Sequence, residues 1–382
     1  MKSFPTSAEE LSTDWLSRTL HENGVPENVT VTNFSFGPVS DPGQTSEVCR
    51  INLEYNSSHT SAPRSVIGKF PAKNEQARVF IKNLGYYLNE VNFFSLIAPS
   101  SGELMPLCYA AEINEDNHEF VLILEDLEGL ETLSLFAQID ESKWRLMIER
   151  IAEFHARWWK HPDLDNFNWM INISKDNYLA RAKKNQTMFF ESVSLVKEKF
   201  GSYLSESAWS ALKKYAETFI EQTKCNIANP PQSLTICHGD YHPQQCFFPT
   251  KSNPRFAIVD WQILGIREGA QELARAMSFI DPILRRDIEE SLVRNYLQIL
   301  LKNSSENYTF EQLWEDLSLQ VLDSLMTNIA AIANTDLHVF IDNAAKHGSD
   351  ALEVLLSRPG SAVDDWKAGE ELDSRLGRVS SV

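Results

Sequence analysis

The first hydrophobic pattern in the chain has the period of a helix. Its apolar positions are Leu11, Trp15, Leu16 and Leu20. Ser7 and Glu10, which are three residues apart, form the signature of a capping box just before these positions. We therefore expect a helix that begins after Ser7 and ends near Asn23-Gly24.

Between residues 29 and 71 the hydrophobic pattern becomes that of short strands. Three β-rich segments, VTVTNFSF, VCRINLEY and RSVIGKF, are separated by turn-rich stretches. A helical pattern over residues 83–98 follows, and then two more strand patterns over residues 107–113 and 119–127. Together these elements predict a five-stranded antiparallel sheet with one helix, forming an N-terminal lobe over residues 1–124.

After residue 127 the apolar positions return to helical spacing, so the C-terminal lobe, residues 125–382, is expected to be mainly α. Its helical faces include one from Trp144 to Trp158, one over Leu212–Thr223 and one that begins with a capping box at Thr309. Two short β-like segments, LTICHGDYHPQQCFF and RFAIVDWQ, interrupt this helical lobe. Such an interruption is typical of a functional site.

Composition and charge narrow the possible functions. Of the 382 residues, 53 are acidic and 35 are basic, and the net charge of -18 argues against nucleic acid as a partner. The five cysteines are scattered without a CxxC pair, which favours a reducing compartment over a disulfide framework or a zinc site. No apolar stretch is long enough for a signal peptide core or a membrane span, so we expect a cytoplasmic protein.

The interrupting segments carry residues in the order that phosphoryl transfer needs. His238-Gly239-Asp240 is followed five residues later by Gln245, and Asp260 comes twenty residues after Asp240. On the protein-kinase plan, the first Asp orients and deprotonates the acceptor hydroxyl, and the later oxygen and second Asp bind magnesium. Each piece alone is also explained by a turn or a helix cap, but their order and spacing together favour a kinase.

The N-terminal lobe supplies a lysine and a carboxylate that fit the same plan. Lys69 lies on the third predicted strand, and Glu90 lies in the following helix among apolar residues. In isolation each is explained as an ordinary solvated side chain. Because an unpaired carboxylate in apolar surroundings is costly, we expect Glu90 to pair with Lys69, and the pair to hold the α- and β-phosphates of ATP.

These motifs resemble those of the aminoglycoside phosphotransferase and choline kinase superfamily, and more specifically those of its ecdysteroid-kinase-like branch. The resemblance rests on VIGKFP, LILEDL, EFHARWW, CHGDYHP and IVDWQ, and covers roughly residues 35–277. It implies an α+β, protein-kinase-like, two-lobed fold that binds ATP and Mg²⁺. The implied reaction moves the γ-phosphoryl group to a hydroxyl of a small molecule, which could be a metabolite, sterol, amino alcohol or antibiotic.

The resemblance also implies roles for individual residues. Asp240 becomes the catalytic base, Gln245 and Asp260 the metal ligands, and Lys69 with Glu90 the phosphate clamp. The remaining implied positions are the adenine-binding backbone at Glu125 and Leu127, the phosphate loop at Gly43 to Ser46, and loop support from His238, His242 and Glu272.

Two departures from the family pattern leave a second interpretation open. The family usually has Asn at the position of Gln245, and the loop over residues 37–46 has only two glycines and does not match G-x-G-x-x-G. The alternative is therefore a catalytically silent nucleotide-binding or regulatory module of the same fold. A protein kinase is disfavoured because no A-P-E segment follows Asp260.

Overall fold

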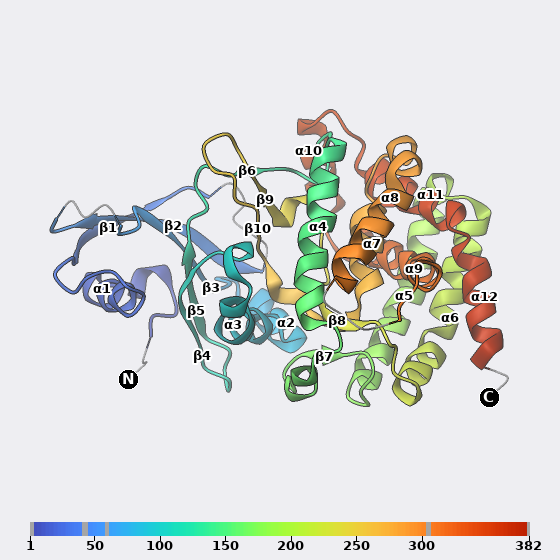
Figure 1. Cartoon of the computed structure of the whole chain (residues 1–382), viewed down its shortest axis with the longest axis horizontal. Helices are drawn as coiled ribbons and strands as arrows, with labels where there is room; N and C mark the ends of the chain where they lie inside the picture. The colour runs from blue at the N-terminus through green and yellow to red at the C-terminus, as the bar shows by residue number, and fades with distance from the viewer. Residues whose placement is uncertain (1–3, 40–44, 58–60, 303–306, 380–382) are drawn as a thin grey trace. The chain divides into compact units, whose positions relative to one another are not determined.

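The computed structural model describes residues 4–39, 45–57, 61–302 and 307–379 (Figure 1). The chain packs into two compact units. The sheet unit contains residues 1–131 and 247–263, and the helical unit contains residues 132–246 and 264–382. The sequence pattern placed the division between residues 124 and 125, and it did not include the return of the chain to the sheet unit at residues 247–263.

The sheet unit is built on five antiparallel strands in the order β1-β2-β3-β5-β4. Their bounds are β1 Val31–Gly37, β2 Ser46–Tyr55, β3 Ser65–Pro71, β4 Cys108–Ile113 and β5 Phe120–Glu125. This confirms the fold class expected from the alternating pattern. A small sheet in the order β10-β9-β6 contains β6 Glu131–Thr132, β9 Cys246–Phe248 and β10 Ala257–Ile258.

Helix α1 (Thr13–Glu22) begins later than the sequence pattern predicts. The hydroxyl of Ser12 accepts a hydrogen bond from the Trp15 N–H at 3.2 Å, so Ser12 is the cap. The capping box predicted at Ser7 and Glu10 is wrong, because the Ser7 side chain caps nothing and the Glu10 carboxylate accepts from Thr6 instead. The predicted end near Asn23-Gly24 is confirmed.

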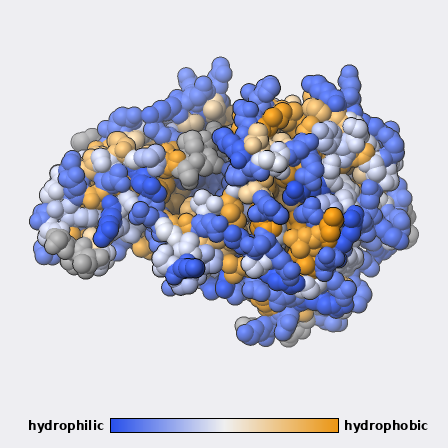
Figure 2. Space-filling view, turned by 90° about the horizontal axis from the view of Figure 1, so that it is seen from above, coloured by the Kyte–Doolittle hydropathy of each residue, from blue (hydrophilic) through white to orange (hydrophobic). Residues whose placement is uncertain are grey.

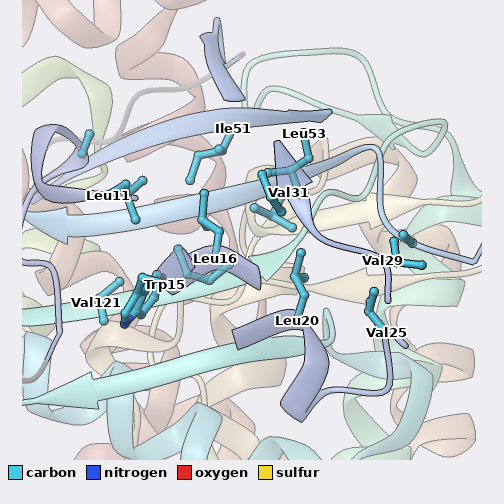
Figure 3. Close-up of a cluster of buried hydrophobic side chains, with 14 of the residues drawn as sticks. Leu11, Trp15, Leu16, Leu20, Val25, Val29, Val31, Ile51, Leu53 and Val121 are labelled. Carbon is cyan, nitrogen blue, oxygen red and sulfur yellow. The ribbon is translucent and has the colours of Figure 1, made fainter. Parts of the chain in front are cut away.

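The apolar face of α1 covers one face of the five-stranded sheet (Figure 3). Figure 3 shows Trp15, Leu16 and Leu20 of the helix pointing toward strand residues such as Ile51 and Leu53. Burying several large aliphatic and aromatic side chains stabilises the unit, at roughly 1.5 to 3 kcal/mol for each fully buried one. The apolar residues that recur at helical spacing in the sequence are thus the side chains of α1 that pack in the core.

The helix predicted over residues 83–98 is largely confirmed: α3 (Tyr86–Asn92) is continued by a π-helical turn over Phe93–Ile97. A further helix, α2 (Glu75–Leu84), precedes α3 and was not predicted. Gly85 separates them with a φ of 76°, a left-handed conformation that glycine adopts at little cost. The sequence pattern missed α2 because two of its large apolar side chains, Val79 and Phe80, are exposed.

The helical unit contains the helices from α4 onward. Their bounds are α4 Glu141–Trp158, α5 Tyr178–Phe200, α6 Glu206–Ala228, α7 Gly269–Met277, α8 Pro282–Leu301, α9 Phe310–Asn334, α10 Leu337–Lys346, α11 Arg358–Asp365 and α12 Ala368–Val379. The capping box predicted at Thr309 is confirmed at the start of α9. A three-stranded sheet in the order β7-β11-β8 contains β7 Ile171–Asn172, β11 Gly265–Glu268 and β8 Leu234–Cys237. Strand β8 of this sheet leads the chain into the Asp240 loop.

The surface carries both hydrophilic and apolar residues. Figure 2 shows one face on which hydrophilic residues are widely spread and are interrupted by smaller apolar patches. In the part of the chain that the structure describes, no helix has both the length and the apolar character required to cross a membrane.

Candidate active site

Lys69, Glu90 and Asp260 meet inside the sheet unit although they are far apart in the sequence. Lys69 lies on β3, between Val48 of β2 and Leu122 of β5. Its Nζ is 2.6 Å from Glu90 Oε1 on α3 and 3.3 Å from Asp260 Oδ1, which follows β10. The ion pair that the sequence predicted between Lys69 and Glu90 is therefore present.

The electrostatics of this cluster keep the lysine charged. Burial works against the charged form of Lys69, but Glu90 and Asp260 outweigh it and raise the pKa of the ammonium group above its ordinary value. Burial also raises the pKa of Glu90, in spite of the attraction of Lys69. Lysine remains much the stronger base, so we describe the pair as an ammonium and a carboxylate.

The segment Asp260-Trp261-Gln262 has an unusual backbone and many anchors. Asp260 has a φ of 66°, which is uncommon outside glycine, and strained positions of this kind cluster at functional sites. Gln262 holds the segment: its Nε2 donates to Asp260 Oδ1 at 2.8 Å, and its Oε1 accepts from Thr45 Oγ1 at 2.7 Å. The Asp260 carboxylate is thereby fixed in one orientation.

Two neighbours from α3 and the turn after it support the same segment. Asn89 Nδ2 donates to the Gln262 carbonyl at 2.9 Å. The buried Trp261 ring stacks on Phe93, with centroids 4.1 Å apart and an interplanar angle of 8°. Sequence reasoning did not assign Asn89 or Gln262, although Gln262 lies within the IVDWQ motif.

The predicted hinge at Glu125 to Leu127 is firmly held. The Glu125 carboxylate pairs with Arg255 at 2.7 Å, and Asp126 accepts from Arg50 and Ser65 at 2.6 Å each. The Glu125 N–H donates to the Leu107 carbonyl, and the Leu127 carbonyl accepts from the Leu130 N–H. The Glu125 N–H and the Leu127 carbonyl are therefore already bonded, so the adenine prediction falls on the Glu125 carbonyl and the Leu127 N–H.

The predicted phosphate loop is only partly described. Gly43 lies outside the described residues. Ser46 is the first residue of β2 and is buried, and it pairs with Pro71 across the sheet. Its neighbour Thr45 joins the loop to Gln262 through the hydrogen bond given above.

In the helical unit, the loop after β8 carries Asp240. Gly239 has a φ of 87°, a conformation that glycine adopts readily. The buried carboxylate of Glu272 on α7 accepts from the His238 N–H at 2.7 Å and from the Gly239 N–H at 3.0 Å. The Asp240 N–H donates to His238 Nδ1 at 3.2 Å. Glu272 and His238 therefore fix the backbone that presents Asp240.

The Asp240 carboxylate lies between two basic side chains. Arg275 donates from Nη2 to Oδ1 at 2.8 Å and from Nε to the same oxygen at 3.2 Å. His242 Nε2 is 3.4 Å from Oδ2. Burial opposes ionisation of Asp240, but His242 and Arg275 outweigh it and hold the pKa far below the ordinary value. The side chain keeps 25% exposure, so a ligand can still reach it.

Arg275 is itself held from three sides. Its Nη1 donates to the Asn328 side chain and, at 3.2 Å, to the Ser324 carbonyl, both on α9. Its guanidinium lies 4.7 Å from the centre of the Phe279 ring. Sequence reasoning missed Arg275, which stands three residues after Glu272 in GAQELARAM.

Glu272 and Gln245 are the last two site residues that the sequence predicted. Burial raises the pKa of Glu272 to about 7, against the stabilising N–H groups of Gly239 and His238. Gln245 ends a short 3₁₀ turn, Pro243–Gln245, and its N–H donates to the His242 carbonyl at 3.0 Å.

The structure thus brings Lys69, Glu90 and Asp260 together in one unit. It groups Asp240, His238, His242 and Glu272 in the other.

The fold of this chain occurs in a known structure. The choline kinase of Cryptosporidium parvum Iowa II aligns with a TM-score of 0.50 at 11% identity, over 96% of this chain and 97% of that one. The ethanolamine kinase of Plasmodium vivax aligns with a TM-score of 0.48 at 11% identity, over 86% of this chain and 84% of that one. At such low identity the likeness shows the fold alone.

Comparison with sequence families is more specific. No curated protein sequence matches the chain significantly. The model of the ecdysteroid kinase-like family matches residues 43–307, which include Lys69, Glu90, Asp240 and Asp260. Because this match spans more than half of the 382 residues and confirms the resemblance of the motifs, the chain belongs to the ecdysteroid kinase-like family.

Proposed function

We propose that the protein transfers the γ-phosphoryl group of ATP to a hydroxyl of a small molecule, with Mg²⁺ as cofactor. The observation that carries this proposal is the cluster of Lys69, Glu90 and Asp260, with Nζ 2.6 Å from Glu90 and 3.3 Å from Asp260. A strand lysine oriented by a helix glutamate, beside a metal-binding aspartate, is the arrangement that kinases use to hold a nucleotide.

The sheet unit would bind the nucleotide. Lys69 would contact the α- and β-phosphates, with Glu90 holding its ammonium group in place. The Glu125 carbonyl and the Leu127 N–H would hydrogen-bond adenine, and the loop that contains Gly43 and ends at Ser46 would cover the phosphates. These assignments are supported by the geometry of Lys69 and by the anchoring of the hinge through Arg255.

Asp260 and Gln245 would hold the metal. Both offer oxygen ligands, which suit Mg²⁺, and Mg²⁺ sites in kinases use one or two protein side chains together with the phosphates. When bound, the metal neutralises charge on the phosphates. Asp260 suits this task because Gln262 fixes its carboxylate at 2.8 Å, while 38% of its side chain stays exposed.

The helical unit would act on the acceptor. Because His242 and Arg275 hold the pKa of Asp240 far below its ordinary value, the carboxylate is ionised throughout the physiological range and is a weak base. Its main contribution would be to orient the acceptor hydroxyl, and it would take the proton as the bond to phosphorus forms.

The acceptor can be found with a screen for ADP release. Purified protein with Mg-ATP should release ADP when a hydroxylated sterol, amino alcohol, sugar or antibiotic of the right shape is added. Mass spectrometry should then find the phosphorylated acceptor in an amount equal to the ADP. ADP release without a phosphorylated product would contradict transfer, because water would then be the acceptor.

The second candidate is a catalytically silent nucleotide-binding module. It is favoured by Gln245, where the family usually has Asn, since the longer side chain moves the amide oxygen by roughly an ångström or more. This candidate predicts that Mg-ATP binds but that no acceptor in a broad panel is phosphorylated. Transfer to any acceptor, lost in Asp240→Asn, would rule it out.

A further inference from the structure

A pocket of about 170 Å³ lies wholly within the helical unit, and its lining does not include Asp240, His242 or Arg275. Helices α5, α6, α7, α9 and α12 and strand β11 contribute to its walls. Its volume is about the liquid volume of six water molecules, which is below the usual size of a drug-binding pocket. The pocket would therefore accept only a small ligand.

Arg267 on β11 is the unusual residue of this pocket. Its Nε is buried without a hydrogen-bond partner, and among the described residues no carboxylate forms an ion pair with its guanidinium. Gly265 makes room for this side chain, since a Cβ at that position would lie 2.9 Å from Arg267 Nε. A buried N–H group without a hydrogen-bond partner is costly, and a bound anion that accepts from it would offset this cost.

Three other charged groups of the pocket already have partners. Asp323 on α9 accepts from the Tyr215 hydroxyl at 3.2 Å and from the Gln271 amide. Arg375 pairs with Asp316 at 2.6 Å. Glu268 accepts from the Gln320 amide at 2.6 Å. Of the two cations of the pocket, Arg267 is therefore the one whose charge a ligand would complement.

We propose that this pocket binds a small monocarboxylate, whose carboxylate pairs with the Arg267 guanidinium and whose apolar part contacts Phe219 and Leu319. The planar fork of guanidinium donors matches the two oxygens of a carboxylate. Phe219 and Leu319 are buried side chains that line the same pocket. The hydroxyl of Tyr178, which also lines it, has no partner among the described residues and can donate to the same carboxylate.

The charge of the walls favours a single negative charge over two. Asp323 and Glu221 line the pocket, so a phosphate dianion would meet more repulsion there than a carboxylate. Burial, followed by the repulsion of Asp316, raises the pKa of Glu268 to about 7, so part of this carboxyl is neutral at physiological pH. A ligand with a single negative charge, placed beside the Arg267 guanidinium, therefore suits the charges of the pocket walls.

This site is independent of the proposed phosphoryl transfer, and its test requires no catalysis. Cys225 lines the pocket, is a free thiol and is partly exposed, so its alkylation by iodoacetamide reports occupancy. Burial raises the pKa of Cys49 to about 11 and that of Cys108 to about 12, so these thiols react slowly and serve as internal references.

The experiment follows alkylation of Cys225 in the full chain by peptide mass spectrometry. The probes are butyrate and benzoate, their neutral amides as matched controls, and inorganic phosphate. At ten times its dissociation constant, a bound carboxylate should slow alkylation about tenfold, and the neutral amides should not. Calorimetry with the same probes measures the dissociation constants without relying on the thiol.

Variants test the role of Arg267. Arg267→Gln should weaken carboxylate binding at least about tenfold, because a charge-assisted hydrogen bond is lost, and Arg267→Lys should restore part of it. Arg150→Gln, which breaks a surface pair with Glu153, should bind as the wild type does. Thermal unfolding of each variant establishes that it is folded.

Four results would overturn the proposal. The first three are protection by the amides equal to that by the acids, undiminished protection in folded Arg267→Gln, and failure of both carboxylates to bind or protect. Tighter binding of phosphate than of benzoate and butyrate would also overturn the assignment to monocarboxylates.

Discussion

The two clusters of buried charge in this protein are built in opposite ways. In the sheet unit, one cation, Lys69, lies between two carboxylates, Glu90 and Asp260. In the helical unit, one carboxylate, Asp240, lies between two basic side chains, Arg275 and His242. The first cluster holds a lysine charged, and the second holds a carboxylate ionised.

This difference matches the two tasks of a phosphotransferase. A charged ammonium group beside an exposed carboxylate can bind phosphates and their metal. A carboxylate that stays ionised at all physiological pH values can orient a hydroxyl without being protonated itself. We therefore expect changes in the first cluster to act mainly on nucleotide binding, and changes in the second to act mainly on turnover.

The largest effect is expected for Asp240→Asn. Because Asp240 acts on the acceptor, turnover should fall at least roughly 10²-fold, while the affinity for Mg-ATP should change little. The measurement is phosphoryl transfer to the acceptor found in the screen, beside calorimetric titration with ATP. Near wild-type turnover in Asp240→Asn would show that the second cluster is not catalytic.

A smaller loss of turnover, about tenfold, is expected for Arg275→Gln. The substitution removes two hydrogen bonds to Asp240 Oδ1, so the pKa of Asp240 should rise toward its ordinary value. The acid limb of the pH–rate profile should then move to higher pH, and Arg275→Lys should restore part of the shift. Arg294→Gln is a matched control, because Arg294 also has a carboxylate partner and an aromatic ring 4.0 Å away. A purely structural role would leave the pH profile unmoved.

Gln245 is expected to affect the magnesium requirement more than maximal turnover. If its amide oxygen binds the metal, Gln245→Ala should need several-fold more Mg²⁺ for half-maximal activity, and Gln245→Asn should need the same amount or less. The measurement is a magnesium titration at saturating ATP. Identical magnesium curves for the wild type and Gln245→Ala would remove this residue from the metal site.

The smallest effect concerns stability and pH. Burial raises the pKa of both Glu272 and Glu268 to about 7. The folded protein therefore binds more protons than the unfolded chain between about pH 4.5 and pH 7, and the contribution of these carboxyls to stability falls as pH rises through this window. Urea unfolding at several pH values should show a slope that is less negative for Glu272→Gln than for the wild type.

The comparison between variant and wild type is what tests this prediction. Burial lowers the pKa of His155 to about 3, and this group acts in the opposite direction over part of the same window. Its contribution is common to both proteins and cancels in the difference. Glu311→Gln, at the exposed start of α9, should keep the wild-type slope. Equal slopes in all three proteins would show that Glu272 is ionised in the fold at neutral pH.

Residues that a motif carries could be predicted from the sequence. Lys69, Asp240 and Asp260 stand at fixed distances from recognisable strands and loops, so their places on β3, in the loop after β8 and directly after β10 followed from order and spacing. Glu90 could be predicted to pair because a carboxylate among apolar helix residues needs a partner. The five strands followed from their alternating pattern, since one face of this sheet is covered by α1.

Residues that act through distant side-chain contacts could not be predicted. In the sequence, Arg275 has the pattern of an ordinary helix residue. Its role depends on hydrogen bonds to Asp240, 35 positions earlier, and to Asn328, 53 positions later. Helix α2 was missed for a related reason: Val79 and Phe80 are 51% and 62% exposed, so its apolar residues do not mark a buried face. Local patterns predict elements, but not the contacts that form after they pack.

Above all, we propose that the first cluster binds the nucleotide and the second does not. Its most direct test is calorimetric titration of Mg-ATP into the wild type, Lys69→Ala, Asp240→Asn and Lys73→Ala. Lys73 is a matched control because it also has two carboxylate partners, Glu9 and Glu47, but is 66% exposed. We predict similar binding to the wild type, Asp240→Asn and Lys73→Ala, and loss of most binding to Lys69→Ala. Absence of binding to the wild type, or undiminished binding to Lys69→Ala, would contradict the account.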